Sequence, residues 1–335
     1  MFCSPFFLLS LDGEARETAG EVLVGTLGWT GNFRFTFEVD NTGALRLLAG
    51  INPYASEYEL PRGEVFRTPD FYFTYSTEGT GKASRDFHDW ARRHQLKDGM
   101  ETRMTLLNNW EATYRAKYPH LPMMLCSGGG GRSDYEALRY FTEFWPSDNT
   151  DPIERLFIQW GFSHVFPAKT LCAHVTSWNG KAGIKFRTDV AMMGKLGFDI
   201  DLSHLDEREV AFCQQAVQTY NALKPVILDG DLYRLVSPYS GQHTSSMYVS
   251  KDKSRAVVFA FDVYPRYAEK LLPVRLQGLE ADRTYRVKEI NRMPGAKPSA
   301  ADEGTLYSGD YLMTVGLPLF TTRSLNSRVL QVEAE

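Results

Sequence analysis

The first quarter of the chain alternates apolar and polar residues in short runs. These runs are rich in Val, Phe, Tyr and Thr, are separated by Gly, Asn, Asp and Pro, and read EVLVGTL, FRFTFEVD, ALRLLAGI and FRTPDFYFTYS. A period of two with these residue types is typical of antiparallel strands, and DNTG at residues 40–43 is typical of a turn between two of them. The pattern predicts that residues 1–82 are part of an N-terminal β-sandwich.

The period changes to that of a helix after a glycine-rich link at residues 78–82. The segment ASRDFHDWARRHQ has charged residues on one side and an apolar stripe on the other. The stripe consists of Phe87, Trp90 and Ala91. We predict an amphipathic helix within a helical linker at residues 83–104, and we place His88 and His94 on its solvated side or at its end.

Two apolar runs in the middle of the chain, residues 123–125 and 144–145, each end in a polar or glycine-rich turn. Residues 135–144 carry apolar side chains at helical spacing, so the pattern indicates a strand, a turn, a helix, a second strand and a second turn. In such α/β units the chemistry lies at the C-terminal ends of parallel strands. We therefore expect residues 126–132 and 147–151 to lie side by side on one face.

These two turns carry residues that could bind a ligand. The glycines at residues 128–131 would let a ligand approach the backbone closely, and we expect Arg132, Asp148 and Asp151 to converge nearby. Each feature also has a purely structural interpretation. The glycine run could be a plain turn, and SDNTD could supply the N-cap of a helix that starts near Pro152. In that case the cap would be Asp148, Asn149 or Thr150.

Composition narrows the function classes. The 335 residues are 43% hydrophobic and 23% charged with a net charge of −4, which is typical of a globular protein and gives no signature of nucleic-acid binding. No apolar run reaches the length of a membrane span. The opening MFCSPFFLLSLDGE fits a strand better than a signal peptide, and the compartment stays unassigned. The four cysteines are scattered, without the spacing of metal ligands.

Several segments carry a resemblance to a known family. CSGGGGR followed by WPSDNTDPIERL resembles the α-galactosidases of glycoside hydrolase family 36, in the branch of large bacterial enzymes. LNNWEATY is similar to the first strand of the family's barrel, residues 164–175 to the last strand, and residues 186–203 to the segment that closes the barrel. The resemblance implies a TIM-type (β/α) barrel flanked by antiparallel β-sandwiches.

The chain is short inside the segment that resembles the barrel. Between LNNWEATY and MMLCSGGGGR only residues 115–122 remain, with two prolines, although a parallel crossover needs a dozen or more residues. In the family, several strands and helices occupy this interval. The resemblance therefore implies a chain that is truncated at its N-terminus and internally deleted, with residues 105–225 as an incomplete barrel of about four of eight strands.

The last third of the chain returns to alternation after a predicted helix at residues 206–222. Its runs read MYVSKD, RAVVFAFDVY, YRVKEINRM and YLMTVGL. We predict that residues 226–335 form a C-terminal β-sandwich.

The family's chemistry needs two carboxyl groups. A retaining glycosidase holds them about 5 to 5.5 Å apart, one as nucleophile and the other as acid and then base. The resemblance assigns the acid/base to Asp148, for which a partly desolvated setting beside Trp145 would be suitable. The family's nucleophile lies in a KWD-type motif, and its sugar hydroxyls are held at a DDGW-type strand end; this sequence has neither. Nothing in the sequence places another carboxylate at the required separation; those weighed are Glu111, Asp134 and Asp189.

The resemblance also implies which residues would contact sugar. They are Trp110, Cys126, Ser127, Gly128, Gly129 and Arg132. Trp110 could equally be a core aromatic of the barrel, and His174 and Trp178 are expected to support the site or the core rather than to bind. Hydrolysis by carboxylates implies no metal and no organic cofactor.

Two functions of different classes follow. The first is an α-galactosidase of the retaining type, acting on terminal α-D-galactosyl residues of oligosaccharides but crippled because the nucleophile segment is missing. The second is a non-catalytic remnant that binds sugar weakly or associates with homologues, including a homo-oligomer of this chain. A third outcome is a deleted product that does not fold stably.

Overall fold

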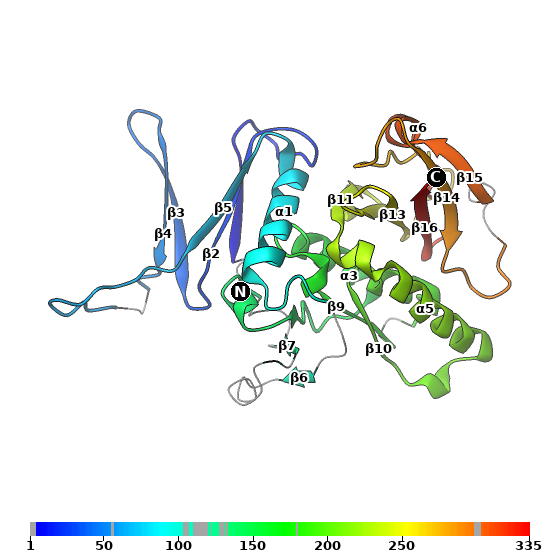
Figure 1. The fold of residues 1–335 in the computed structure, drawn as a ribbon, viewed down its shortest axis with the longest axis horizontal. Helices are drawn as coiled ribbons and strands as arrows, with labels where there is room; N and C mark the ends of the chain where they lie inside the picture. Colours follow the sequence, from blue (N-terminus) through cyan, green and yellow to red (C-terminus); the bar gives the residue numbers. More distant parts are fainter. Residues whose placement is uncertain are drawn as a thin grey trace. The chain divides into compact units, whose positions relative to one another are not determined.

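Figure 1 shows the computed structural model, which describes residues 5–54, 57–102, 107–109, 120, 122–126, 131, 133–178, 180–297 and 303–335. The chain divides into two compact units. The first is Met1–Ser127 with Gly131–Thr142, and the second is Gly128–Gly130 with Glu143–Glu335.

Antiparallel strands form two small sheets in the first unit, where the alternation predicts them. One sheet has the order β1-β2-β5 and consists of Phe6–Ser10, Val22–Leu27 and Phe71–Ser76. The other is a hairpin of β3 (Phe33–Val39) and β4 (Leu45–Ile51). The predicted turn is confirmed: the Asp40 carboxylate accepts hydrogen bonds from the N–H groups of Thr42 (2.8 Å) and Ala44 (3.0 Å), and Gly43 has a φ of +83°.

Aromatic side chains join these two sheets. The ring of Phe7 on β1 lies 5.1 Å from that of Phe35 and 5.3 Å from that of Phe37, both on β3, in edge-to-face geometry. Phe35 also lies 6.1 Å from Phe71 on β5. The sheets therefore pack face to face through rings, as the layers of a small sandwich do.

The helix after β5 starts earlier and is buried more widely than the sequence predicts. Helix α1 spans Gly79–Trp90 and continues as a π-helical turn at Ala91–Gln95. Gly79 has a φ of +78°, and a Cβ there would lie 2.5 Å from the Arg16 carbonyl oxygen, so the predicted glycine-rich link is in fact the helix start. His88 is 2% exposed, and its predicted solvated position is wrong. The buried stripe includes positions 83, 84, 87 and 88 because the helix packs on both β2 and β5.

The segment with the short predicted connection forms a parallel pair. Strand β6 (Leu107–Asn109) pairs in parallel with β7 (Met123–Leu125). The prediction that the connection is too short is wrong, because β6 ends at Asn109 and residues 110–122 are available for the crossover. The helix predicted at residues 135–144 is also wrong. Only a 3₁₀ turn forms there, at Ala137–Arg139, and Tyr135 before it is fully buried.

The second unit begins with short parallel strands and the helices between them. Strand β8 (Glu143–Phe144) bridges in parallel to Leu171, and β9 (Cys172–Thr176) pairs in parallel with β10 (Lys195–Asp199). Helices α3 (Pro152–Phe162) and α4 (Ile184–Ala191) are the crossovers, with 3₁₀ turns at Ala168–Thr170 and Leu202–His204. The prediction that residues 164–175 are the last parallel strand is wrong, since β10 follows it.

A long helix and one antiparallel sheet complete the second unit. Helix α5 (Glu207–Asp229) starts with a capping box between Asp206 and Glu209, and it continues beyond its predicted end through Pro225. The sheet has the order β11-β12-β13-β16-β14-β15. Its strands are Asp231–Val236, His243–Val249, Arg255–Asp262, Asn326–Ala334, Thr284–Ile290 and Glu303–Ser308. YLMTVGL, predicted to be a strand, contains most of helix α6 (Gly309–Thr314), which Ser308 caps.

Both faces of this sheet are covered. On one face, Tyr248, Phe259 and Val329 pack with the apolar side of α5 and with α4. On the other, Val258, Val287 and Leu330 pack against the segments around Val274 and Leu317, which are joined by an isolated antiparallel bridge. The second layer of the predicted sandwich is therefore irregular within the described residues, and a single six-stranded sheet carries both cores.

His164, which follows α3, makes the stability of this unit depend on pH. Burial and the nearby positive charge of Arg234 lower the pKa of His164 to about 3, from its usual value near 6.5. Between pH 3 and 6.5 the folded chain keeps this residue neutral, whereas the unfolded chain binds a proton there. The contribution of His164 to the free energy of unfolding is therefore fully present above pH 6.5 and is lost as the pH falls toward 3. Between pH 7 and 5 we expect a loss of about 2 kcal/mol from this residue.

Urea unfolding of the wild type and of His164→Gln, measured at intervals from pH 7.5 to pH 4.5, tests this expectation. The free energy of unfolding of the variant should fall less steeply than that of the wild type. His94→Gln, which changes an exposed histidine, serves as the control and should keep the wild-type profile. Parallel curves for the wild type and His164→Gln would contradict the assignment.

Candidate functional site

The loop after β8 is organised by a chain of local hydrogen bonds. Ser147 Oγ accepts from the N–H of Asn149 (3.1 Å), and Asn149 Oδ1 accepts from the N–H of Asp151 (3.1 Å). Asp151 Oδ1 accepts from the N–H groups of Ile153 (2.8 Å) and Glu154 (3.4 Å). The helix cap is thus Asp151, followed by Pro152 at the first helical position. The capping interpretation of Asp148, Asn149 or Thr150 is wrong, and Asp148 is left for another role.

Asp148 lies at the C-terminal end of β8 and contacts Trp145. The indole Nε1 donates a hydrogen bond of 2.9 Å to Asp148 Oδ1. The expected neighbour is therefore present. The expected partial burial is not, because Asp148 is exposed in the described structure. The loop presents this carboxylate to solvent in an orientation that the tryptophan fixes.

A buried arginine holds the loop in place. Arg155, on α3, is 3% exposed, and its guanidinium donates to the carbonyl oxygens of Ser147 (2.7 Å), Asn149 (2.7 Å) and Cys172 (3.4 Å). It also lies 4.9 Å from the centroid of the Trp145 ring, a cation–π distance. Burial lowers the pKa of Arg155 to about 10, so the group stays charged at neutral pH. Sequence reasoning missed this residue, although an arginine four positions after a helix cap was its signal.

The neighbouring strand supports the same loop. His174 on β9 packs edge-on against Trp145, with ring centroids 4.8 Å apart, and burial lowers the pKa of His174, which favours the neutral ring. Thr176 Oγ1 donates to Thr150 Oγ1 (2.9 Å). The side chain of Trp178 is 57% exposed. His174 therefore positions Trp145, and through it Asp148.

Beneath the loop, a charged cluster fills the interior. Glu143 is fully buried and pairs with Lys195 Nζ at 2.6 Å. The Cys172 thiol lies 3.7 Å from the same carboxylate, and burial raises the pKa of that thiol well above its usual value. A buried carboxylate paired in this way is structural, since its charge is already compensated.

Two of the three carboxylates considered as substitutes for the nucleophile have structural roles. Asp134 accepts from the N–H of Ala137 (2.8 Å) and from Thr30 Oγ1 (3.1 Å), and burial raises the pKa of Asp134. Asp189 is fully buried. It is bonded by Lys185 Nζ (2.5 Å), Asn291 Nδ2 (2.5 Å) and Ser327 Oγ (2.6 Å). Glu111 lies outside the described residues.

The residues predicted to contact sugar are mostly outside the described part of the chain. Cys126 is described; it follows β7, is partly buried and has a free thiol. Cys126 belongs to the first unit and Asp148 belongs to the second. That residues 126–132 and 147–151 lie side by side on one face therefore stays a prediction. The others lie outside the described residues: Trp110, Ser127, Gly128, Gly129 and Arg132.

The described residues contain neither a metal-type cluster nor a membrane-spanning helix. Within those ranges, no three His, Cys, Asp or Glu side chains are grouped as they would be around a metal ion. Of the helices in the same ranges, none combines the length and the apolar character needed to cross a bilayer.

Family models match most of the chain. The N-terminal domain of glycosyl hydrolase family 36 matches residues 2–61, melibiase matches residues 115–230, and the C-terminal domain of glycosyl hydrolase family 36 matches residues 243–332. The match to melibiase contains the Asp148 loop, Arg155 and His174.

Curated relatives and solved structures agree with these models. α-Galactosidase AgaA of Geobacillus stearothermophilus is 35% identical over 209 residues, which are 61% of this chain and 27% of the relative. A probable α-galactosidase G of Aspergillus terreus is 30% identical over 282 residues, 81% of this chain and 37% of the relative. The chain thus spans 27% to 37% of the length of these relatives. The chain also superposes on the crystal structure of an AgaA variant in complex with raffinose, with a TM-score of 0.87 and 22% sequence identity. The superposition covers 99% of this chain and 69% of the AgaA chain, which shows a shared fold.

Replacing Arg155 tests its role in the loop. Arg155→Met keeps much of the apolar stem but removes the donors to three carbonyl oxygens, and buried acceptors without partners are costly. We expect the variant to lose about 2 to 4 kcal/mol of unfolding free energy in urea titration, together with a change in Trp fluorescence from Trp145.

Arg208→Met is the matched control. Arg208 is an exposed arginine near the start of α5 that donates to a single carbonyl oxygen, that of Pro294. Its replacement should lower the free energy of unfolding by less than about 1 kcal/mol. Equal losses in the two variants would mean that Arg155 does not hold the loop.

Proposed function

The chain belongs to glycoside hydrolase family 36, and from that premise we propose that it recognises α-galactosides but hydrolyses them poorly or not at all. Asp148 is the acid/base in this proposal, and the second catalytic carboxyl group is absent from the sequence. The family includes the α-galactosidases named above, but this chain spans a minority of their length. Activity and substrate are therefore proposed here from the loop around Asp148.

The observation that carries the proposal is the state of Asp148. It is an exposed carboxylate at the C-terminal end of a parallel strand, oriented by Trp145, while its neighbour Asp151 takes the capping role. The C-terminal ends of such strands are where α/β barrels carry their chemistry. A carboxylate so placed can protonate a glycosidic oxygen when a sugar lies over the loop.

Hydrolysis with retention also needs a nucleophile, which forms the glycosyl-enzyme. The sequence has no KWD-type motif, and the described alternatives, Asp134 and Asp189, are used within the fold. An acid alone can assist departure of the leaving group but leaves the oxocarbenium-like transition state without its covalent partner. We therefore expect kcat/KM to be several orders of magnitude lower than in an enzyme that has both carboxyl groups.

The direct pairing of β6 with β7 supports an internally shortened barrel. In the family these two segments are separated by several barrel strands, and here they are neighbours joined by residues 110–122. We propose that residues 105–225 are an incomplete (β/α) barrel, with β10 added to the strands that the sequence indicated. Residues 1–82 and 226–335 are then its flanking β-sandwich domains, and residues 83–104 are the helical linker.

Recognition without turnover is the second part of the proposal. The neighbour solved with raffinose makes oligosaccharides with terminal α-galactosyl groups the ligand class that we propose. Trp110, Cys126, Ser127, Gly128, Gly129 and Arg132 are the proposed contacts, by their match to the family's motifs. An open half-barrel also leaves strand edges that a second copy or a homologue could cover.

Hydrolysis of an aryl α-galactoside at high enzyme concentration tests the catalytic part. We expect kcat/KM at least ~1,000-fold below that of AgaA assayed in parallel. Any residual turnover should disappear in Asp148→Asn, in which the Trp145 hydrogen bond can persist. Asp151→Asn is the matched control, because Asn is as good a cap as Asp, and it should keep the wild-type rate. A rate within tenfold of AgaA would refute the proposal.

Thermal unfolding with raffinose or sucrose tests the recognition part. The two sugars differ by the α-galactosyl group, so a specific site should be stabilised by raffinose and not by sucrose. Stabilisation in the absence of turnover is the expected result. Equal shifts with the two sugars, or none with either, would count against galactoside recognition.

A further inference from the structure

A basic cleft lies in the second unit, away from the Asp148 loop. It has a volume of about 650 Å³ and is formed by the first turn of α4, the end of β14 with the loop after it, and the segment that leads into β16. Its charged lining consists of Lys185, Glu289, Arg292, Lys297, Arg323 and Arg328. Five of these six side chains are basic, so the cleft concentrates positive charge on a chain whose net charge is −4.

Part of this positive charge is uncompensated. Lys185 is held by Asp189 and by the Ser327 carbonyl oxygen, and Arg328 donates to the Pro318 carbonyl oxygen (3.1 Å). In contrast, Arg292, Lys297 and Arg323 have no ion pair with any residue that the structure describes. Arg292 Nη1 is buried there without a hydrogen-bond partner. A buried guanidinium N–H of this kind is costly unless a ligand accepts from it.

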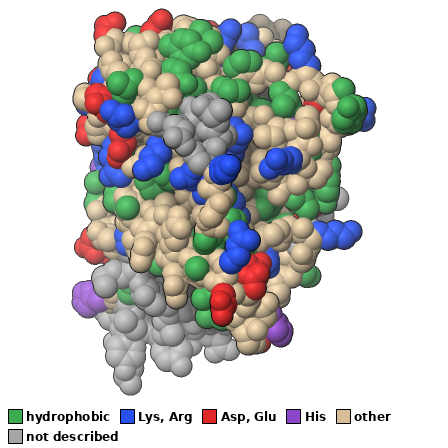
Figure 2. Space-filling view, turned by 90° about the vertical axis from the view of Figure 1, so that its right-hand side faces the viewer, with side chains coloured by type: hydrophobic (Ala, Val, Ile, Leu, Met, Phe, Trp, Pro, Cys, Tyr) green, Lys and Arg blue, Asp and Glu red, His purple; other side chains and the backbone are tan. Residues whose placement is uncertain are grey.

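Surface charge has the same distribution in the space-filling view. In Figure 2, several Lys and Arg side chains gather in the upper half of the face shown, and the Asp and Glu side chains of that half lie mainly toward its edges. The basic residues named above line a cleft of about 650 Å³, which favours a small ligand over a polyanion.

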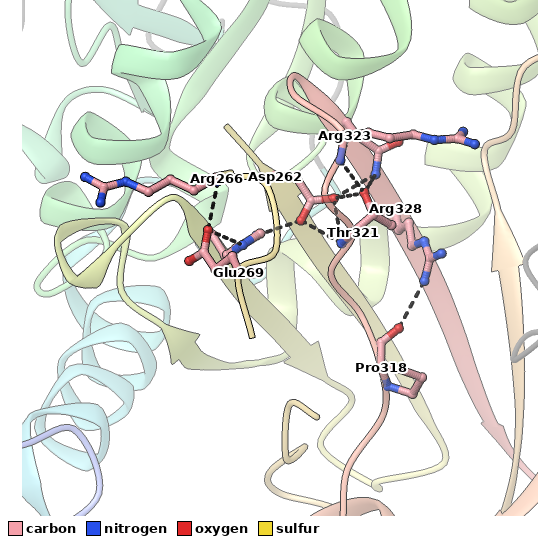
Figure 3. A network of polar contacts seen from close by, with 9 residues as sticks. Asp262, Arg266, Glu269, Pro318, Thr321, Arg323 and Arg328 are labelled. Carbon is pink, nitrogen blue, oxygen red and sulfur yellow. Dashed lines mark hydrogen bonds and ion pairs between the residues drawn. The ribbon is translucent and has the colours of Figure 1, made fainter. Parts of the chain in front are cut away.

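The wall that carries Arg323 is fixed from below by a buried carboxylate. Asp262, 2% exposed, accepts from Thr321 Oγ1 (2.7 Å) and Asn326 Nδ2 (2.9 Å), and its other oxygen is 2.7 Å from His243 Nδ1. In Figure 3 the side chain of Arg323 points away from this network. The cleft wall is thus pre-organised, which reduces the ordering that a ligand must impose.

We propose that the basic cleft binds a small ligand through a phosphate group. Guanidinium groups match phosphate geometry with paired N–H donors, and a dianion compensates more of the unpaired charge than a carboxylate does. The volume exceeds that of a lone phosphate and admits a phosphorylated monosaccharide. Free inorganic phosphate and a sugar phosphate share the recognised chemistry, and the experiment separates them.

Isothermal titration of the full chain with glucose 6-phosphate, glucose and inorganic phosphate, each up to about 10 mM, tests the proposal. We expect heat of binding with the two phosphates and none with glucose, and binding that weakens with added NaCl. Tighter binding of glucose 6-phosphate than of phosphate would identify a sugar phosphate as the occupant. Equal affinities would identify the free anion.

Substitutions at the cleft wall locate the site. Arg323→Gln should weaken phosphate binding about tenfold or more, and Arg323→Lys, which keeps the charge but loses the fork, should weaken it less. Arg266→Gln is the matched control, because Arg266 is an exposed arginine of the same unit that does not line the cleft. Positions 266 and 323 are both exposed to solvent. Urea unfolding verifies that each variant is folded.

Two results would overturn the proposal. One is the absence of binding by a chain that unfolds cooperatively. The other is equal weakening in Arg323→Gln and Arg266→Gln, which would mean that the anion responds to overall charge and not to the cleft. Neither readout depends on hydrolysis or on galactoside recognition, so this proposal can fail or succeed independently of the proposed function.

Discussion

The buried carboxylate of Asp189 is the interaction on which the arrangement of the second unit depends. It lies on α4 with no exposure to solvent, and it is bonded by Lys185 of the same helix, by Asn291 after β14 and by Ser327 of β16. A buried charge left without such partners would cost several kcal/mol. If α4 with the parallel strands β9 and β10 separated from the C-terminal sheet, the Asp189 carboxylate would therefore lose its hydrogen-bond partners or become exposed to solvent.

Helix α4 extends this constraint in two directions. Arg187 donates to the Thr176 carbonyl oxygen (2.7 Å), and Thr176 in turn bonds Thr150 in the loop that carries Asp148. Lys185, one turn earlier than Asp189, lines the basic cleft. The loop and the cleft are thus built on a common helix whose position is fixed by one carboxylate. That shared support gives both features a defined geometry without any contact between them.

The sequence predicted those parts of the fold that local pattern determines. Period-two alternation located the strands of the two sheets in the first unit and β12, β13 and β14 of the C-terminal sheet, although both faces of the C-terminal sheet are covered, and the DNTG turn formed as expected. The sequence-based predictions failed where contacts between residues far apart in the sequence determine the local structure. His88 is buried because a second strand covers the helix flank, and most of YLMTVGL became a helix that Ser308 caps. In the site, a motif indicated Asp148, but the roles of Arg155 and Glu143 depend on partners up to 52 residues away.

The Asp148 loop is shaped by contacts within the second unit. Its cap is Asp151, its carbonyl oxygens are held by Arg155, and its tryptophan is packed by His174, and these contacts all come from residues 143–199. None of these contacts involves a residue of β6 or β7. Catalysis by two carboxylates is different, because it needs a second group fixed at about 5 Å by elements outside this segment. In the function proposed above, the chain keeps a pre-organised acid without its partner, and recognition of a sugar is thereby separated from its cleavage.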